Sequence, residues 1–435
     1  MIRRFSLYGF LKNQRYFDPI IILYFLQHGL TFTQIGLLIG FRELCVIIME
    51  IPSGAIADLF GRRRSMILSF VAYIASFATF GAFAIFGFSP YYWYFFIAMF
   101  FFAIGEAFRT GTNKAMIFTW LRNRGRTDEK TKVYGYTRSW SKLGSALSTL
   151  LAIPIVLLTN DYSYVFLFAI VPYVIGLINF LSYPAELEGQ TSTGVSVRNV
   201  CVHLWQCLRS AIAMKRLRRL IVESMSFEGV YKAAESYLQP VVAGLVLLVP
   251  IFVGMADRSR ETILVCIVYF ILYLGSAYAS RHSHILSDRA GGEEKGSRLL
   301  WKMAFVFYIA LVPLLYFEYY YVAIVGFICL ALIQNFWRPM LMSRFDAFAS
   351  ETHGATILSI ESQAKSFSTM LVAPILGVAV DYVKGHDGLG GYFWPVAAIA
   401  AVFALLMLLT PLKGKGDGVD MDGCKIICAD DTIDK

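Results

Sequence analysis

Long, continuous runs of apolar residues dominate the chain, and short polar intervals separate them. A run of roughly 17 to 25 apolar residues is long enough to cross a bilayer as a helix. Twelve such runs occur, near residues 16–32, 35–57, 65–87, 92–120, 134–158, 163–183, 220–250, 262–281, 299–317, 320–345, 355–382 and 391–411. Spanning strands would need short alternating segments instead, so the pattern predicts an all-α integral membrane protein with 12 transmembrane helices.

The polar intervals divide the chain into four parts. We expect one six-helix bundle over residues 1–184 and a second over residues 219–412. Between them, residues 185–218 begin with small polar residues and become amphipathic, which is typical of a cytoplasmic linker with a helix at the membrane surface. Residues 413–435 are rich in Gly and Asp and poor in large apolar residues, so we expect a disordered cytoplasmic tail.

Positively charged residues gather in alternate polar intervals. These intervals hold Arg3, Arg4, Lys12 and Arg15 before the first run, Arg62–Arg64 after the second, Arg122–Lys132 after the fourth and Lys215–Arg219 where the central interval ends. Because cytoplasmic loops keep an excess of Lys and Arg, both termini are predicted to face the cytoplasm from a plasma or inner membrane. The net charge of +9 then reflects topology, and we expect no nucleic-acid partner.

Composition and motifs argue against an enzyme. With 57% hydrophobic and 16% charged residues, the chain is more apolar than water-soluble globular proteins, in which about a quarter of residues are charged. The seven cysteines lack a paired metal-ligand spacing, and His282 and His284 have no nearby cysteine. The sequence also lacks a phosphate-binding loop, a nucleophile elbow and a zinc-protease helix motif. We therefore predict no catalytic residues, no cofactor and no metal.

A short turn between the second and third runs carries the most specific motif. It reads Gly54-Ala-Ile-Ala-Asp58-Leu-Phe-Gly61-Arg62-Arg63. A carboxylate at one helix end can face the positive N-terminus of another helix, and an arginine can bridge to a neighbouring helix end. The motif resembles the signature loop of the major facilitator superfamily. The resemblance implies two six-helix bundles around a midplane cavity, and a latch for the outward-open state at Asp58, Gly61 and Arg62.

The same resemblance implies which helices line the cavity, namely the first, fourth, seventh and tenth. The substrate- or proton-pathway candidates on these helices are Gln27, Glu106, Arg109, Glu228, Lys232, Glu235, Gln334 and Asn335. Ionisable side chains are expensive in lipid and usually face a partner or a water-filled path. Asp18, at the start of the first run, is expected near the cytoplasmic boundary, where ionisation costs less.

Two groups of charged residues allow both a structural and a functional interpretation. Glu106 and Arg109 are three residues apart, so they share one helix face and can pair. They form either a structural ion pair or a working pair in which Glu106 carries a proton and Arg109 contacts substrate. Glu228, Lys232 and Glu235 recur at spacings of four and three, which predicts one polar stripe. That stripe is either a proton relay through Glu235 or a salt bridge centred on Lys232.

Small residues predict a close helix contact. Gly36 and Gly40 form a small-xxx-small pair on the second run, and Ala373 and Gly377 form another on the eleventh. Such pairs permit close backbone approach, and these helices are candidates to slide against each other during transport.

These patterns predict a secondary transporter of a small solute that works by alternating access. We expect proton-coupled export of amphipathic compounds, because the many aromatic residues suit a permissive cavity. The alternative is proton-coupled uptake of a polar nutrient or organic anion through Arg109. A receptor or membrane-embedded enzyme on the same scaffold is the hypothesis from another class. The expected partners are a small-molecule substrate, protons or another coupling ion and the lipid bilayer, and we expect a monomer.

Overall fold

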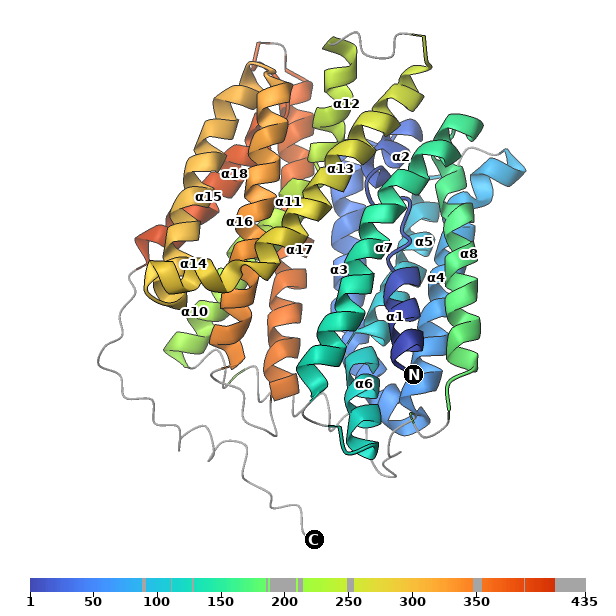
Figure 1. The fold of residues 1–435 in the computed structure, drawn as a ribbon. Coiled ribbons are helices and arrows are strands. Elements are labelled where there is room, and N and C mark those ends of the chain that lie inside the picture. Colours follow the sequence, from blue (N-terminus) through green and yellow to red (C-terminus); the bar gives the residue numbers. More distant parts are fainter. Residues whose placement is uncertain are drawn as a thin grey trace.

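The computed structural model describes residues 1–87, 91–110, 112–126, 129–184, 187, 209, 214–248, 254–346, 354–386 and 388–410. All regular secondary structure in these residues is helical. The helices form two groups that stand side by side, one from each half of the chain (Figure 1). Most of the predicted linker and the predicted tail lie outside the described residues.

Each half of the chain contributes its own set of helices. The first half forms α1 (Ile2–Leu11), α2 (Ile21–Gln27), α3 (Phe32–Phe60), α4 (Arg62–Phe86), α5 (Tyr92–Arg109), α6 (Thr112–Asn123), α7 (Lys130–Thr159) and α8 (Ser163–Leu181). The second half forms α10 (Lys215–Ser224), the π-helical turn η3 (Met225–Gly229), α11 (Val230–Glu235), α12 (Leu238–Leu248), α13 (Asp257–Arg281), α14 (Ser283–Ala290), α15 (Glu293–Tyr316), α16 (Tyr320–Asp346), α17 (Gly354–Lys384) and α18 (Trp394–Leu409).

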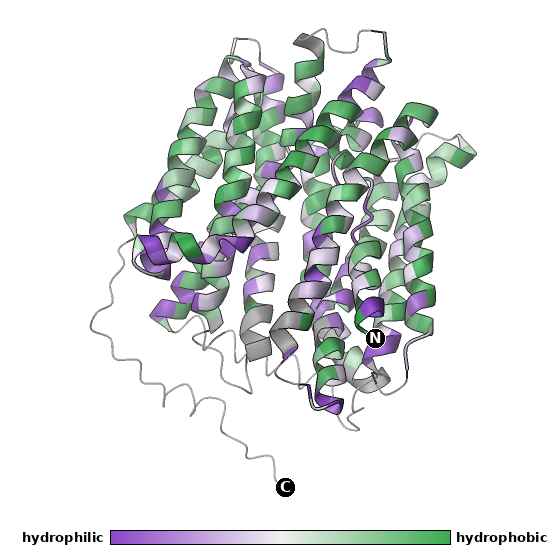
Figure 2. Cartoon of the chain, viewed as in Figure 1, coloured by the Kyte–Doolittle hydropathy of each residue, from purple (hydrophilic) through white to green (hydrophobic). Residues whose placement is uncertain are grey.

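The predicted all-α membrane architecture is confirmed, but several crossings are interrupted. Within the described residues, eight helices are long and apolar enough to cross a membrane by themselves. The other crossings consist of α1 with α2, α5 with α6, α10 through α12, and the shorter α18. Hydrophobic residues cover most of the length of these helices (Figure 2), as expected for elements surrounded by lipid.

The first crossing differs most from the prediction. Its helix begins at Ile2 rather than near residue 16, is interrupted over residues 12–20, and continues as α2. Lys12 and Arg15 therefore lie within the crossing instead of before it, and Asp18 lies in the interruption rather than at the membrane boundary. A hydropathy window misses such a helix because the charged residues lower the mean hydropathy. Their partners lie on distant segments, which a window along the sequence does not include.

A glutamine from the other half of the chain holds this interruption. The Gln239 amide, on α12, donates to the Asp18 carbonyl oxygen at 2.9 Å. Its carbonyl oxygen accepts from the backbone N–H of Ile22 at 2.7 Å, near the start of α2. One buried side chain thus satisfies a donor and an acceptor that the interrupted helix leaves unpaired.

The two halves pack most closely where α3 meets α17. A Cβ atom added at Gly36 would collide with the Ala373 carbonyl oxygen, and one added at Gly377 would collide with that of Phe32. A Cβ at Gly40 would lie 2.9 Å from the Met370 carbonyl oxygen. The predicted close approach of these two helices is confirmed, because their backbones touch where the small residues lie.

Polar contacts also join the halves at the end farthest from Met1, which we call the distal end. The Asp381 carboxylate of α17 accepts from the backbone N–H groups of Phe32 (3.1 Å) and Thr33 (2.7 Å), so it caps α3. The Tyr162 hydroxyl donates to Glu261 of α13 at 3.0 Å. The distal end is therefore closed by contacts between α3 and α17 and between α13 and the start of α8.

We predict that a methyl group at the α3–α17 contact lowers stability. Gly36→Ala should lower the free energy of unfolding by about 1–3 kcal/mol, because two backbones must move apart. Gly254→Ala is the matched control, since a Cβ there meets no atom within 4 Å. Thermal unfolding of the purified proteins in detergent measures both. Equal melting temperatures for the two variants would show that the contact is looser than described.

Candidate functional site

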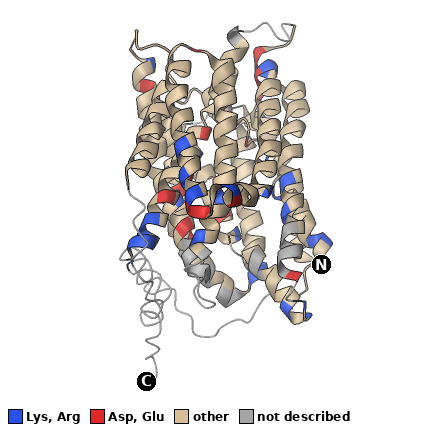
Figure 3. Ribbon diagram, turned by 60° about the vertical axis from the view of Figure 1, so that its left-hand side comes forward, with Lys and Arg blue, Asp and Glu red and all other residues tan. Residues whose placement is uncertain are grey.

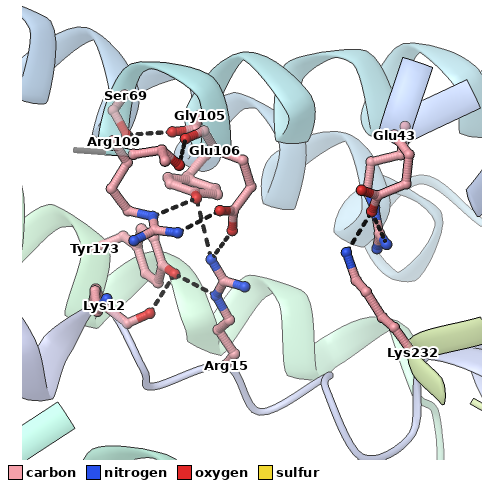
Figure 4. Close-up of polar contacts among 12 residues, drawn as sticks. Lys12, Arg15, Glu43, Ser69, Gly105, Glu106, Arg109, Tyr173 and Lys232 are labelled. Atoms are coloured by element: carbon pink, nitrogen blue, oxygen red, sulfur yellow. Dashed lines mark hydrogen bonds and ion pairs between the residues drawn. The ribbon is translucent and has the colours of Figure 1, made fainter. Parts of the chain in front are cut away.

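A carboxylate shared by two arginines forms the centre of the N-terminal half (Figure 4). Glu106, on α5, makes ion pairs with Arg109 one turn later and with Arg15 in the interruption of the first crossing. The three side chains keep 18–20% of their surface exposed. They therefore border an accessible space instead of lying sealed in the core.

Two tyrosines fix the guanidinium groups. The Tyr73 hydroxyl, on α4, accepts from both Arg15 and Arg109 at 3.2 Å. The Tyr173 hydroxyl, on α8, accepts from Arg15 at 3.1 Å and donates to the Lys12 carbonyl oxygen at 2.7 Å. Because Lys12 begins the interruption, its carbonyl is available to Tyr173, and the contact fixes the segment that carries Arg15.

A glycine brings Tyr73 into this position. A Cβ atom at Gly105 would lie 2.8 Å from the Tyr73 ring, so a side chain at this site would displace the ring. Ser69 of α4 donates to the Gly105 carbonyl oxygen at 2.7 Å. The sequence Gly105-Glu106 thus packs α5 against α4 and directs the carboxylate toward the first crossing.

A second shared carboxylate joins the two halves. Glu43, on α3, accepts from Arg42 and from Lys232 of α11, each at 2.7 Å. The Glu43 side chain is 4% exposed, whereas the Lys232 side chain is 41% exposed. A salt bridge centred on Lys232 exists, but its partner is Glu43 rather than Glu228 or Glu235, so the predicted stripe is wrong in this respect.

The other members of that stripe have separate surroundings. Glu228 is buried and accepts from Arg338 at 2.6 Å and from Gln334 at 3.3 Å, both on α16. It lies in the π-helical turn η3, where the wider turn changes the helical register before Lys232. Within the described residues, Glu235 forms no ion pair.

Two of the predicted pathway residues form hydrogen bonds away from the Glu106 and Glu43 clusters. The Gln27 amide donates to Asp161 at 2.8 Å, and its oxygen accepts from the Tyr162 backbone at 3.2 Å, so it belongs to the distal closure. Asn335 donates to Ser276 of α13 at 3.0 Å and to the Ala331 carbonyl. We leave both out of the proposed pathway.

Sequence reasoning missed Arg15 and Glu43. Glu43 lies inside the second apolar run, so the rule that intramembrane charges have partners would have identified it. Arg15 directly precedes the first predicted run, and ten residues of helical sequence precede it in turn.

Acidic and basic residues gather in a band about half-way along the helices and toward the end that carries Met1 (Figure 3).

Residues 13–373 match the sequence profile of the Major Facilitator Superfamily. The chain belongs to this superfamily. A relative from Bacillus subtilis (strain 168), the uncharacterised MFS-type transporter YxaM, is 22% identical over 406 residues, which cover 91% of this chain and 92% of YxaM. Membership of the superfamily makes the chain a secondary transporter rather than an enzyme.

Solved structures of superfamily members share the fold. The nucleoside transporter NupG aligns with a TM-score of 0.71 at 12% identity, covering 94% of this chain and 98% of NupG. A D-xylose–proton symporter aligns with a TM-score of 0.66 at 14% identity, and the alignment covers 93% of this chain and 96% of the symporter. At these identities the likeness concerns the fold alone.

The superfamily's signature loop lies between α3 and α4. Gly61, with a φ of 95°, adopts a backbone conformation that favours glycine and allows the sharp turn. Arg62 donates to the Thr119 hydroxyl of α6 at 2.7 Å, and Arg63 donates to the Leu181 carbonyl at the end of α8 at 2.7 Å. Arg63 thus caps a helix C-terminus, a role beyond charge bias. The Asp58 side chain lies outside the description, and the latch function of Asp58, Gly61 and Arg62 remains a prediction.

Asp161, in the loop between α7 and α8 at the distal end, predicts a pH dependence of stability. Burial raises the pKa of Asp161, but hydrogen bonds from Gln27 and Ser163 favour the carboxylate and bring its pKa below the ordinary value. A lowered folded-state pKa stabilises the protein above the unfolded pKa, and this stabilisation is lost as the pH falls through the folded-state pKa. Asp161→Asn should therefore lower the melting temperature at pH 7 and have little effect near pH 3.

The control for this measurement is Asp257→Asn, which changes an exposed carboxylate at the same end. Its effect on the melting temperature should be small at both pH values. If Asp161→Asn lowers the melting temperature by the same amount at pH 7 and pH 3, the proposed stabilisation by the Asp161 carboxylate is contradicted.

Proposed function

We propose that this transporter carries a small organic anion that binds at Arg15 and Arg109. The observation that supports this is the sharing of Glu106, which gives one negative charge to two guanidinium groups. Counted by these ion pairs, the cluster has one positive charge in excess. Such a charge in a membrane interior is costly unless water or an anion meets it. Planar guanidinium groups also suit carboxylate and phosphate oxygens.

Lys12 adds a further positive charge near the Glu106 cluster. It begins the interruption, its ammonium lies 5.7 Å from the centroid of the Tyr8 ring, and it forms no ion pair within the described residues. The arrangement favours the organic-anion alternative over export of amphipathic compounds. Many aromatic rings of the N-terminal half are instead buried against one another, as the stacked pair Phe17–Phe166 illustrates.

The conformation supports alternating access. Contacts join the two halves at the distal end, while the side chains of the Glu106 cluster stay partly exposed. The basic residues of the opposite end favour the cytoplasm by the charge rule. On this orientation the structure represents the inward-facing state, and the signature loop between α3 and α4 lies at the cytoplasmic face.

Glu235 is the best candidate for the coupling proton. Glu106 can accept a proton only by giving up two ion pairs, whereas Glu235 has none within the described residues. It ends α11, one turn before Gln239, which contacts the interruption of the first crossing. A proton at Glu235 would thus neutralise a carboxyl beside the segment that carries the substrate-binding arginine. We assign the transporter to proton-coupled uptake.

Proteoliposomes with an imposed pH gradient test the proposal. A binding survey first identifies an anion, and Arg109→Gln should then lower its uptake by roughly 30-fold or more, the cost of removing a charged partner. Glu235→Gln should abolish the response to the pH gradient and leave exchange of labelled for unlabelled anion intact. Arg122→Gln, at an exposed position, serves as the control.

Three results would contradict the proposal. Uptake of a neutral or cationic solute that Arg109→Gln leaves unchanged would reject the anion site. A gradient response that survives in Glu235→Gln would reject the coupling residue. Binding without any flux would favour the receptor hypothesis.

A further inference from the structure

The clusters around the two shared carboxylates, Glu106 and Glu43, meet at one aromatic ring. The guanidinium carbons of Arg15 and Arg42 are positioned over one ring, that of Phe102, at 5.2 and 5.9 Å from its centroid. Arg15 belongs to the Glu106 cluster, and Arg42 belongs to the Glu43 cluster. The two clusters are therefore neighbours that both contact the Phe102 ring, and they appear together in Figure 4.

Both clusters have the same charge imbalance. Counted by its ion pairs, each consists of two cations and one carboxylate and so has one positive charge in excess. The Asp18 carboxyl, which interacts with Arg15 and Arg42 at longer range, is not part of either set of ion pairs. The second cluster differs in that Lys232 comes from the other half of the chain. The Lys232 side chain is also the most exposed of the four cationic side chains, while its partner Glu43 is almost fully buried. A solute that enters the space meets Lys232 before Glu43.

We propose that Glu43 is a resident counter-ion that the substrate displaces from Lys232, and that the substrate is a compact dianion. One anionic group would bind Arg15 and Arg109, and the other would bind Lys232. This inference rests on the proposed function, because it takes the anion site at Arg109 as given. It adds the second anionic group and the residue that receives it.

The exchange is physically reasonable because Arg42 stays behind. Removing one partner of a buried ion pair is strongly destabilising when the other charge is left alone. Here Glu43 retains its contact with Arg42 after Lys232 turns to the substrate. A dianion would also balance both excess charges at once, whereas a monoanion would balance one.

The exchange would link binding to movement. In the empty transporter, the Glu43–Lys232 pair joins α3 to α11 and so holds the two halves together. When Lys232 binds substrate, the substrate takes the place of Glu43 in connecting the halves. A ligand shifts a conformational equilibrium only by interacting differently with the two states, and the loss of this pair provides such a difference.

Binding of matched anions to the purified full-length protein tests the inference. The dianions are succinate, glutarate and methyl phosphate, and the monoanions are butyrate, valerate and dimethyl phosphate. The wild type should bind at least one dianion about tenfold or more tightly than its matched monoanion. Lys232→Gln should remove this preference and leave the monoanion affinity unchanged. Lys232→Arg should keep it.

Glu43→Gln gives the decisive result. If Glu43 competes with substrate, the variant should bind the dianion more tightly than the wild type. If the pair is only a structural bridge, the variant should bind mono- and dianions equally weakly, and this result would overturn the inference. Should Glu43→Gln fold poorly, Glu43→Asp, which keeps the charge but is one methylene shorter, should also bind the dianion more tightly than the wild type. Unchanged or weaker dianion binding by this variant would overturn the inference. Lys295→Gln, at an exposed position, is the control.

The outcomes separate this inference from the proposed function. Monoanion binding that depends on Arg109, without any dianion preference in the wild type, overturns only the inference. Absence of binding by all six probes overturns it as well. Anion binding that Arg109→Gln leaves unchanged rejects the proposed function itself. Preference for succinate or for methyl phosphate distinguishes a dicarboxylate from a phosphate ester.

Discussion

An arginine inside a membrane protein needs an anionic partner, and in this transporter the first crossing is interrupted where it places Arg15 beside Glu106. A continuous helix would occupy its own backbone groups, whereas the interruption leaves the Lys12 carbonyl free for Tyr173 and the Asp18 carbonyl free for Gln239. The polar centre of the N-terminal half is therefore built from backbone geometry as much as from charged side chains.

The same constraint explains how the two halves meet. Each shared carboxylate satisfies two cations, and Glu43 does so across the boundary between the halves. Tight packing of α3 on α17 brings Glu43 within reach of α11, since glycines at that contact allow the backbones to touch. The distal closure, the ion pair between halves and the accessible arginines are thus parts of one arrangement, in which binding energy can act on the relative position of the halves.

The sequence predicted the fold well and the site only in part. Apolar runs and loop charge are local signals, and they sufficed for the crossings and for the small-residue contact at Gly36. Glu106 and Arg109 were predictable because a spacing of three decides their pairing. Arg15 was not, because its partner is 91 residues away and the helix before it is too polar for a hydropathy window. Lys232 was recognised, but its partner lies in the other half, and no spacing within one helix can reveal that.

The coupling free energy between Arg15 and Glu106 tests the central claim most directly. Unfolding of the wild type, Arg15→Gln, Glu106→Gln and the double variant forms a complete cycle. The account predicts that the double variant loses less stability than the sum of the losses of the two single variants, by about 1 kcal/mol or more. The reason is that each single variant already removes the same Arg15–Glu106 contact. Additive losses would show that Arg15 and Glu106 do not interact and would contradict the account.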